Sequence, residues 1–114
     1  MDRFNERPVK EITVQELENL IDRNQDFQLI DVREEYEHKV ANIGGKLIPL
    51  SKVYFHLADI EKDKKVVIYC RSGRRSAEAV RMLEEATSHA KLYNLKGGIL
   101  AWAKEIDQSV SIEL

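Results

Sequence analysis

The residues of this chain that could carry chemistry gather in one short segment, residues 70–76, which reads Cys-Arg-Ser-Gly-Arg-Arg-Ser. Its cysteine, Cys70, is the only one in the sequence, and an ionised cysteine is a strong nucleophile. The apolar run directly before it is typical of a strand that is buried on both faces. We expect the next helix to open at Ser76, about six residues after the cysteine. A loop that runs from a strand into a helix directs backbone N–H groups into one concave space, so the segment predicts an anion-binding loop.

Positive charge and amide dipoles in this loop favour the ionised form of the sulfur. Three arginines lie within five positions, and no acidic residue of the loop offsets them. The N-terminus of a helix stabilises a nearby negative charge by ~0.3–1 kcal/mol, and by up to ~2 kcal/mol where the charge is partly buried. The residues expected around the Cys70 thiolate are Arg71, Ser72, Gly73, Arg74, Arg75 and Ser76. Such a loop would hold an incoming anion or a terminal persulfide anion, which is the chemistry of sulfur transfer.

A structural interpretation of the cysteine has to be weighed against this one. A lone cysteine at the end of a buried strand often serves as a small apolar core residue. That interpretation does not account for three arginines, a glycine and two serines in the same turn. The clustering therefore favours a functional site over a packing role.

Composition and charge describe an ordinary globular domain. Of the 114 residues, 43% are hydrophobic and 33% charged, which fits a single domain, residues 1–114, with a core of about 9–106 and polar ends. A net charge of −2 gives no reason to expect nucleic acid or a membrane as partner. A single cysteine forms no internal disulfide, suits a reducing cytoplasm and excludes zinc sites built on cysteine pairs. Because the N-terminus lacks the apolar stretch of a secretory signal, we expect a cytoplasmic protein.

Short apolar strands alternate with amphipathic helices along the chain. Helices are expected after Thr13, which forms a capping box with Glu16, after Ser51, from Ser76 and after the glycine pair 97–98. The expected strands are residues 9–12, 27–32, 46–50, 65–70 and 91–95. Helices between strands imply right-handed crossovers. The sequence therefore predicts an α/β three-layer sandwich, with a mostly parallel sheet of about five strands and helices on both faces.

Polar residues outside the loop carry weaker signals. The three histidines show no ligand spacing and are interpreted as surface or loop residues; they are His38, His56 and His89. Three acidic residues after the second strand are interpreted as a solvated face; they are Glu34, Glu35 and Glu37. Ile99 and Trp102 are assigned to the core side of the last helix.

Residues 70–76 resemble the active loop of the rhodanese-type sulfurtransferases. Three further segments resemble that family in the same order along the chain, namely residues 29–33, 42–49 and 95–102. Together the segments cover the chain from about residue 10 to residue 106. The chain departs from the usual pattern at Asn42 and Gly44, which replace a common His and Pro. This departure bears on the rigidity of a turn more than on catalysis.

The resemblance implies a rhodanese-like fold in which Cys70 is the nucleophile and the persulfide carrier. Loop amides and the three loop arginines would surround the bound sulfur or its donor. Asp31 and Arg33 would lie near the loop at the end of the neighbouring strand; the alternative, which we favour for Arg33, is an ion pair that pins strand ends together. The implied reaction transfers sulfur in two steps without a metal or organic cofactor. The donor would be thiosulfate or a protein persulfide, and the acceptor a thiol, cyanide or an acceptor protein.

Three alternatives stay open at this point. A cysteine phosphatase also uses a thiolate before a helix, but its Cys-x5-Arg signature requires arginine where this chain has Ser76, and Arg75 comes one position early. A non-catalytic docking module generally lacks the cysteine or the loop charge, and this chain has both. Two stretches, residues 41–46 and 100–107, resemble rhodanese domains fused behind ubiquitin-activating-like adenylyltransferases. Those domains carry sulfur for thiocarboxylate formation of the molybdopterin or thiamine type.

Overall fold

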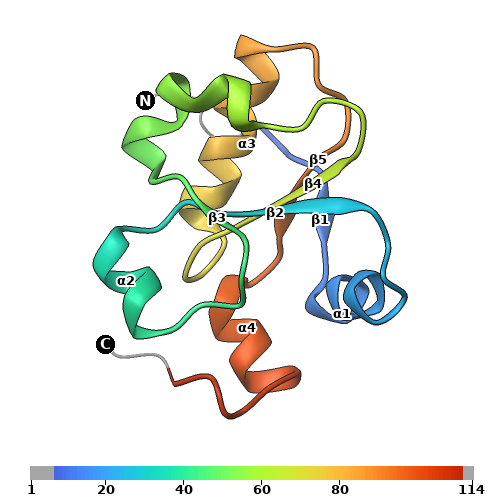
Figure 1. Cartoon of the computed structure of the whole chain (residues 1–114), viewed down its shortest axis with the longest axis vertical. Coiled ribbons are helices and arrows are strands. Elements are labelled where there is room, and N and C mark those ends of the chain that lie inside the picture. The colour runs from blue at the N-terminus through green and yellow to red at the C-terminus, as the bar shows by residue number, and fades with distance from the viewer. Residues whose placement is uncertain (1–6, 112–114) are drawn as a thin grey trace.

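The computed structural model describes residues 7–111, which fold around a five-stranded sheet (Figure 1). Residues 1–6 and 112–114, which belong to the polar ends expected from the sequence, lie outside the described residues. The strand order is β1-β5-β4-β2-β3, and every neighbouring pair is parallel. The strands are β1 Glu11–Ile12, β2 Phe27–Asp31, β3 Lys46–Leu47, β4 Lys65–Tyr69 and β5 Leu92–Leu95. The predicted α/β fold with a parallel sheet of about five strands is confirmed.

Helices cover both faces of the sheet. They are α1 Val14–Asp22, α2 Glu35–Val40, the 3-10 helix η2 Leu50–Asp59, α3 Arg74–Ala86 and α4 Gly98–Glu105. Helix α3 packs with η2, whereas α1 packs with α4. Alternate side chains of β4 point to the two sides: Val66 packs in the same core cluster as Val80 of α3, and Val67 packs in a second cluster with Leu17 of α1. Burial on both faces explains the unbroken apolar run of this strand.

Helix α3 begins earlier than the sequence suggested. Its N-cap is Gly73, which has a φ of 101°, and Arg74 is its first residue. Ser76 therefore lies in the first turn, and the helix expected to open at Ser76 was placed too late. A glycine adopts positive φ at little steric cost, so Gly73 can turn the chain into the helix only three residues after Cys70.

Two other predicted helix N-termini can be compared with the structure. Thr13 and Glu16 form the predicted capping box, with the Glu16 N–H donating to Thr13 Oγ1 at 3.1 Å and the Thr13 N–H donating to Glu16 Oε1 at 2.8 Å. The helix expected after Ser51 is the 3-10 helix η2, which begins at Leu50 and has no side-chain cap. The strand expected over 46–50 is limited to the short β3, although the N–H groups of Ile48 and Leu50 still donate to the carbonyl oxygens of Asp31 and Val32 at 2.9 and 3.0 Å.

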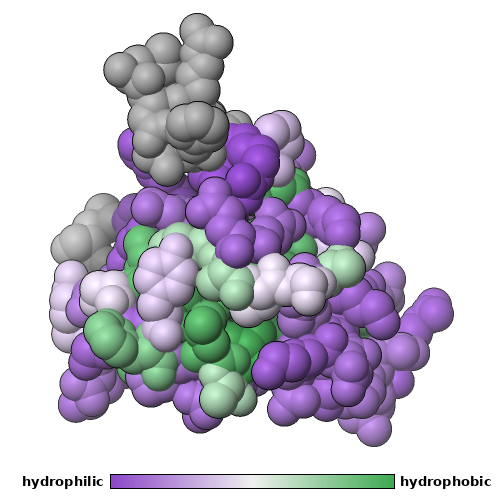
Figure 2. Space-filling view, turned by 90° about the horizontal axis from the view of Figure 1, so that it is seen from above, coloured by the Kyte–Doolittle hydropathy of each residue, from purple (hydrophilic) through white to green (hydrophobic). Residues whose placement is uncertain are grey.

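The face of the molecule seen from above is largely hydrophilic, and one hydrophobic patch interrupts its polar side chains (Figure 2). Element η2 lies at this end of the molecule (Figure 1) and carries two exposed aromatic residues, Tyr54 and Phe55. Within residues 7–111, none of the helices has the length and apolar character needed to cross a bilayer.

Candidate active site

Two backbone N–H donors and one serine hydroxyl lie against the sulfur of Cys70. This residue directly follows β4, and its Sγ accepts from the backbone N–H groups of Gly73 at 3.1 Å and Ser76 at 3.3 Å. The Ser76 hydroxyl lies 3.3 Å from the same sulfur. Because these groups sit at the N-terminus of α3, the helix dipole also favours negative charge here. The arrangement suits a thiolate or a bound sulfur anion.

The start of α4 holds the cysteine loop in place. The backbone N–H of Ile99 donates to the carbonyl oxygen of Cys70 at 2.9 Å, and the N–H of Leu100 donates to that of Arg71 at 3.1 Å. Gly98 has a φ of 63°, and a Cβ added there would collide with both carbonyl oxygens. The second glycine of the Gly-Gly pair is therefore required for α4 to approach the loop.

Asn94 on β5 is a site residue that the sequence analysis missed. Its side chain is buried, its Nδ2 donates to the Gly73 carbonyl at 3.1 Å, and its Oδ1 accepts from the Ser76 hydroxyl at 2.5 Å. The same Nδ2 donates to Glu11 Oε2 on β1 at 3.3 Å. Asn94 thus contacts both residues that donate to the Cys70 sulfur. The available sequence signal was an amide in the interior of a largely apolar strand, where a polar side chain needs buried partners.

Arg75 of the loop is paired with Glu37 of α2. Its two terminal nitrogens donate to the two carboxylate oxygens at 2.8 and 2.9 Å. The hydrogen bond from Arg75 lowers the pKa of Glu37 to about 2, against the opposing effect of burial. The bond to Glu37 raises the pKa of Arg75. The interpretation of Glu37 as part of a solvated face is therefore wrong, although Glu34 and Glu35 are exposed.

The remaining loop residues lie at its outer rim. Ser72 and Arg74 are exposed, and Arg71 is partly exposed. The structure therefore brings Gly73 and Ser76 to the sulfur and leaves these three residues at the surface. Two guanidinium groups at the rim can meet an anion that approaches from solvent.

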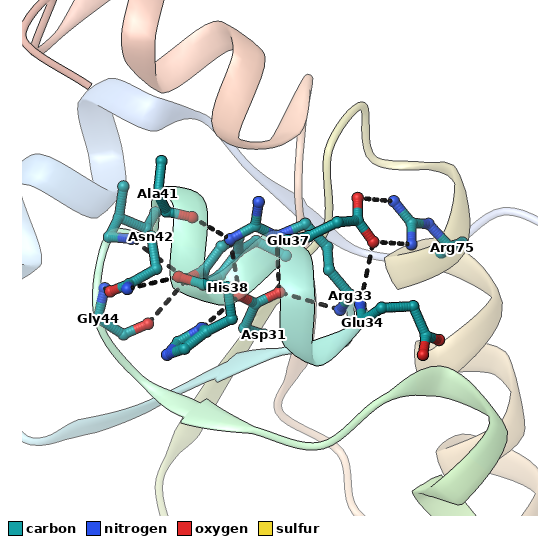
Figure 3. A network of polar contacts seen from close by, with 11 residues as sticks. Asp31, Arg33, Glu34, Glu37, His38, Ala41, Asn42, Gly44 and Arg75 are labelled. Atoms are coloured by element: carbon teal, nitrogen blue, oxygen red, sulfur yellow. Dashed lines mark hydrogen bonds and ion pairs between the residues drawn. The ribbon is translucent and has the colours of Figure 1, made fainter. Parts of the chain in front are cut away.

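Asp31 and Arg33 form a buried ion pair at the end of β2 (Figure 3). Arg33 Nε donates to Asp31 Oδ1 at 2.9 Å, and Nη2 donates to Oδ2 at 2.8 Å. Burial works to lower the pKa of Arg33, but the hydrogen bonds and charge of Asp31 prevail and raise it. The ion pair favoured for Arg33 is present, but both partners lie at the end of β2, so it does not join the ends of two strands. His38 was interpreted as a surface or loop residue, but it lies in α2, is partly buried, and its Nδ1 is 2.8 Å from Asp31 Oδ2.

The turn in which the chain departs from the usual rhodanese pattern is held by side-chain contacts. Asn42 Oδ1 accepts from the Gly44 N–H at 2.8 Å, and Asn42 Nδ2 donates to the His38 carbonyl at 3.0 Å. The Tyr69 hydroxyl donates to the Gly44 carbonyl at 2.8 Å. These bonds restrain the turn in the absence of the usual proline.

Cys70 lies at the floor of its loop and is only 1% exposed. Its side chain belongs to the same core cluster as Val80 and Leu92. The sulfur is therefore enclosed rather than open to solvent. A hollow lined by Leu57, Ile60 and residues 86–89 lies at the other end of α3, about 20 Å away for a helix of this length.

Known proteins resemble this chain over most of its length. The model of the rhodanese-like domain family matches residues 13–105. A sulfurtransferase from Allochromatium vinosum is 36% identical over 97 residues, which cover 84% of this chain and 90% of that protein. The putative sulfurtransferase YtwF of Bacillus subtilis is 35% identical over 104 residues, which cover 85% and 93%.

A larger protein and two solved structures are also similar to this chain. The probable adenylyltransferase/sulfurtransferase MoeZ of Mycobacterium tuberculosis is 39% identical over 98 residues, or 83% of this chain, but the chain spans only 25% of that protein. A rhodanese-like domain protein from Staphylococcus aureus has a TM-score of 0.77 at 31% identity, covering 93% of this chain and 100% of that one. A thiosulfate sulfurtransferase from Pseudomonas aeruginosa has a TM-score of 0.80 at 20% identity, covering 95% and 21%, which shows a shared fold.

Proposed function

This chain belongs to the rhodanese-like domain family, and on that premise we propose that it is a sulfurtransferase that carries sulfane sulfur as a persulfide on Cys70. The observation that carries the proposal is that two backbone N–H groups at the start of α3, those of Gly73 and Ser76, both donate to the Cys70 sulfur. Relatives named sulfurtransferases, which match nearly their whole length to this chain, support it.

The proposed reaction has two steps and balances without a metal or organic cofactor. The Cys70 thiolate attacks the outer sulfur of thiosulfate or of a protein persulfide. The S–S bond of the donor breaks, and sulfite or a thiolate leaves with the electron pair. A thiol, cyanide or an acceptor protein then attacks the outer sulfur of the enzyme persulfide and releases the Cys70 thiolate again. Such covalent catalysis divides one difficult transfer into two easier ones.

Different residues of the loop would have different roles in this reaction. Backbone N–H groups of Gly73 and Ser76 would stabilise negative charge on sulfur in a preorganised position. Arg71 and Arg74 at the rim would attract the anionic donor. The enclosure of Cys70 would keep water from the persulfide.

Phosphatase chemistry is the weaker alternative. Where the phosphatase signature needs arginine, this chain has Ser76, which is buried and in contact with Cys70 Sγ. Arg75 is one position early and is held by Glu37. No arginine of the loop is thus placed to clamp the equatorial oxygens of a phosphate.

Two further candidate functions of the domain are sulfur supply to a partner enzyme and non-catalytic docking. The similarity to MoeZ supports a second candidate, in which the domain supplies sulfur to an adenylyltransferase that forms a thiocarboxylate. A purely non-catalytic docking role is less favoured because the loop retains a cysteine whose sulfur accepts from two backbone N–H groups.

Intact mass spectrometry after treatment with thiosulfate tests the proposal. The parent protein should gain one sulfur atom, lose it with dithiothreitol and pass it to cyanide as thiocyanate, whereas Cys70→Ser should gain none. An unloaded parent protein would reject thiosulfate as donor, and a second treatment with a small-molecule persulfide would then decide on sulfur transfer itself. Hydrolysis of p-nitrophenyl phosphate faster than thiocyanate formation would favour the phosphatase.

A further inference from the structure

The buried amide of Asn94 shares the Ser76 hydroxyl with the sulfur of Cys70. We propose that Asn94 is a positioning residue that competes with this sulfur for the hydroxyl proton of Ser76, and thereby sets how far that hydroxyl can stabilise the sulfur anion. The inference rests on the proposed function only for its importance to catalysis, because the competition itself is a property of the resting protein.

The competition follows from the number of protons. A serine hydroxyl has one proton to donate, and two acceptors lie within its reach: Asn94 Oδ1 at 2.5 Å and Cys70 Sγ at 3.3 Å. The shorter contact directs the proton to Asn94. With the proton so placed, the serine oxygen offers lone pairs to the sulfur, which suits a thiol S–H and does not help a thiolate.

The orientation of the Asn94 amide is fixed by its other contacts. Nδ2 faces two acceptors, the Gly73 carbonyl at 3.1 Å and Glu11 Oε2 at 3.3 Å. A flipped amide would place its oxygen against both acceptors, so Oδ1 has to face Ser76. The register of β4 and β5 pairs Asn94 with Ile68, which puts the amide on the same side of the sheet as Cys70.

Asn94 also supports a second donor to the sulfur. Its Nδ2 holds the carbonyl of Gly73, whose N–H donates to Cys70 Sγ. The side chain is 2% exposed, so solvent does not replace these bonds readily. Loss of the bond to the Gly73 carbonyl would by itself move the titration midpoint of the sulfur to higher pH, which opposes the effect of freeing the Ser76 hydroxyl. The two effects separate in a Ser76→Ala background, where only the first remains.

Charged groups on every neighbouring element bear on the ionisation of the sulfur, and most of them are unaffected by a change at position 94. They are Arg71 and Arg74 in the loop, Arg75 on α3 with Glu37 on α2, Asp31, Arg33 and His38 around β2, Lys96 after β5, and Glu11 on β1. Glu11 alone among them contacts Asn94. Glu11→Gln therefore serves as the control for its charge, and because Glu11 is exposed its replacement should move the titration by less than about 0.3 pH unit.

The test is the pH titration of the Cys70 thiolate, followed by its ultraviolet absorbance. Each protein is measured against its own Cys70→Ser counterpart, so that the absorbance of the tyrosines cancels in the difference. Because absorbance is read directly, no reagent has to reach the buried sulfur. Asn94→Leu removes the competitor and lets the hydroxyl donate to sulfur, so the midpoint should move to lower pH by about half to one unit. Asn94→Asp retains the hydroxyl and adds negative charge, so the midpoint should move to higher pH.

A double-mutant cycle separates this role from simple support of the fold. In a Ser76→Ala background, Asn94→Leu should no longer lower the midpoint, whereas Asn94→Asp should still raise it. Asn94→Ala carries the same expectation as Asn94→Leu and replaces it if the leucine variant does not fold. Shifts of both variants in the same direction, or a leucine shift that persists without Ser76, would overturn the proposal. Neither result depends on sulfur loading, so failure of the proposed function would be seen separately.

Discussion

Glu37 on α2 and Arg75 on α3 form a two-point ion pair, although 38 positions separate them in the sequence. Arg75 directly precedes Ser76, so the pair ties α2 to the helix turn that supplies donors to the cysteine sulfur. Figure 3 shows this pair beside the Asp31–Arg33 pair. The surroundings of the loop are therefore held together by two ion pairs that differ in burial, and these should respond differently to mutation.

Replacement of Glu37 by Gln should lower the free energy of unfolding by about 1 to 3 kcal/mol at neutral pH. The change removes one charge and retains the size of the side chain. A solvent-screened ion pair contributes about 1 kcal/mol, and the lowered pKa of Glu37 sets the upper figure of about 3 kcal/mol. Urea unfolding followed by circular dichroism measures the difference. Glu35→Gln is the matched control, because Glu35 is 73% exposed and lies 3.9 Å from its partner Lys39. Equal effects of the two substitutions would show that the pair with Arg75 adds no stability.

The contribution of Glu37 should depend on pH in a defined direction. Folding lowers its pKa from 4.5 to about 2, chiefly through the hydrogen bond from Arg75. A carboxylate whose pKa falls on folding stabilises the protein fully above its unfolded-state pKa and loses this effect as pH falls to the folded value. The difference in unfolding free energy between the parent and Glu37→Gln should be constant from about pH 7 to about pH 5 and shrink between about pH 4.5 and pH 2. Growth of the difference on acidification would contradict this shift.

Removal of one partner of the buried pair should cost more than removal of both. Asp31→Asn leaves the Arg33 guanidinium buried without its counter-charge, and we expect a loss of about 3 kcal/mol. The double variant Asp31→Leu, Arg33→Met replaces both charges by apolar groups and should recover at least half of this loss. Urea unfolding of the parent and the two variants measures both quantities. A double variant no more stable than the single one would show that the charges themselves stabilise the end of β2.

Local patterns in the sequence predicted the sheet and the place of the cysteine loop. A strand buried on both faces requires an unbroken apolar run, and β4 has one. The capping box of Thr13 and Glu16 could be predicted from the sequence because both partners lie within one helical turn. Gly73 was harder to interpret, since serine is the stronger cap signal in general and the positive φ of this glycine is visible only in the structure.

Contacts between distant segments could not be predicted in this way. Asn94 meets Ser76 because of the register between β5 and β4, and no spacing in the sequence encodes that register. Glu37 meets Arg75 only because α2 folds back towards the start of α3. The enclosure of Cys70 depends likewise on how α3 and α4 close around the loop. Residue types indicated the chemistry, whereas tertiary packing decided which charges are paired and how far the sulfur is buried.

Gly98→Ala should impair sulfur loading through the loop and not merely through stability. Both Gly98 and Gly44 have positive φ, so alanine at either position strains the backbone, by about 1 kcal/mol or more. Only at Gly98 does the added Cβ meet the carbonyl oxygens of Cys70 and Arg71; at Gly44 it meets open space. A displaced loop would misplace the donors to sulfur, so the rate of persulfide formation from thiosulfate should fall at least about tenfold in Gly98→Ala.

Gly44→Ala is the matched control for this experiment and should load sulfur within about twofold of the parent rate, because its strain arises away from the loop. Both rates are measured by quenched intact mass spectrometry, at a temperature at which thermal unfolding curves show each variant to be folded. Parental loading by a folded Gly98→Ala would mean that α4 does not position the loop. Equal losses in both variants would instead attribute the effect to backbone strain. Only a loss confined to Gly98→Ala supports the close approach of α4 as the feature that holds the Cys70 and Arg71 carbonyls, and with them the geometry of the sulfur.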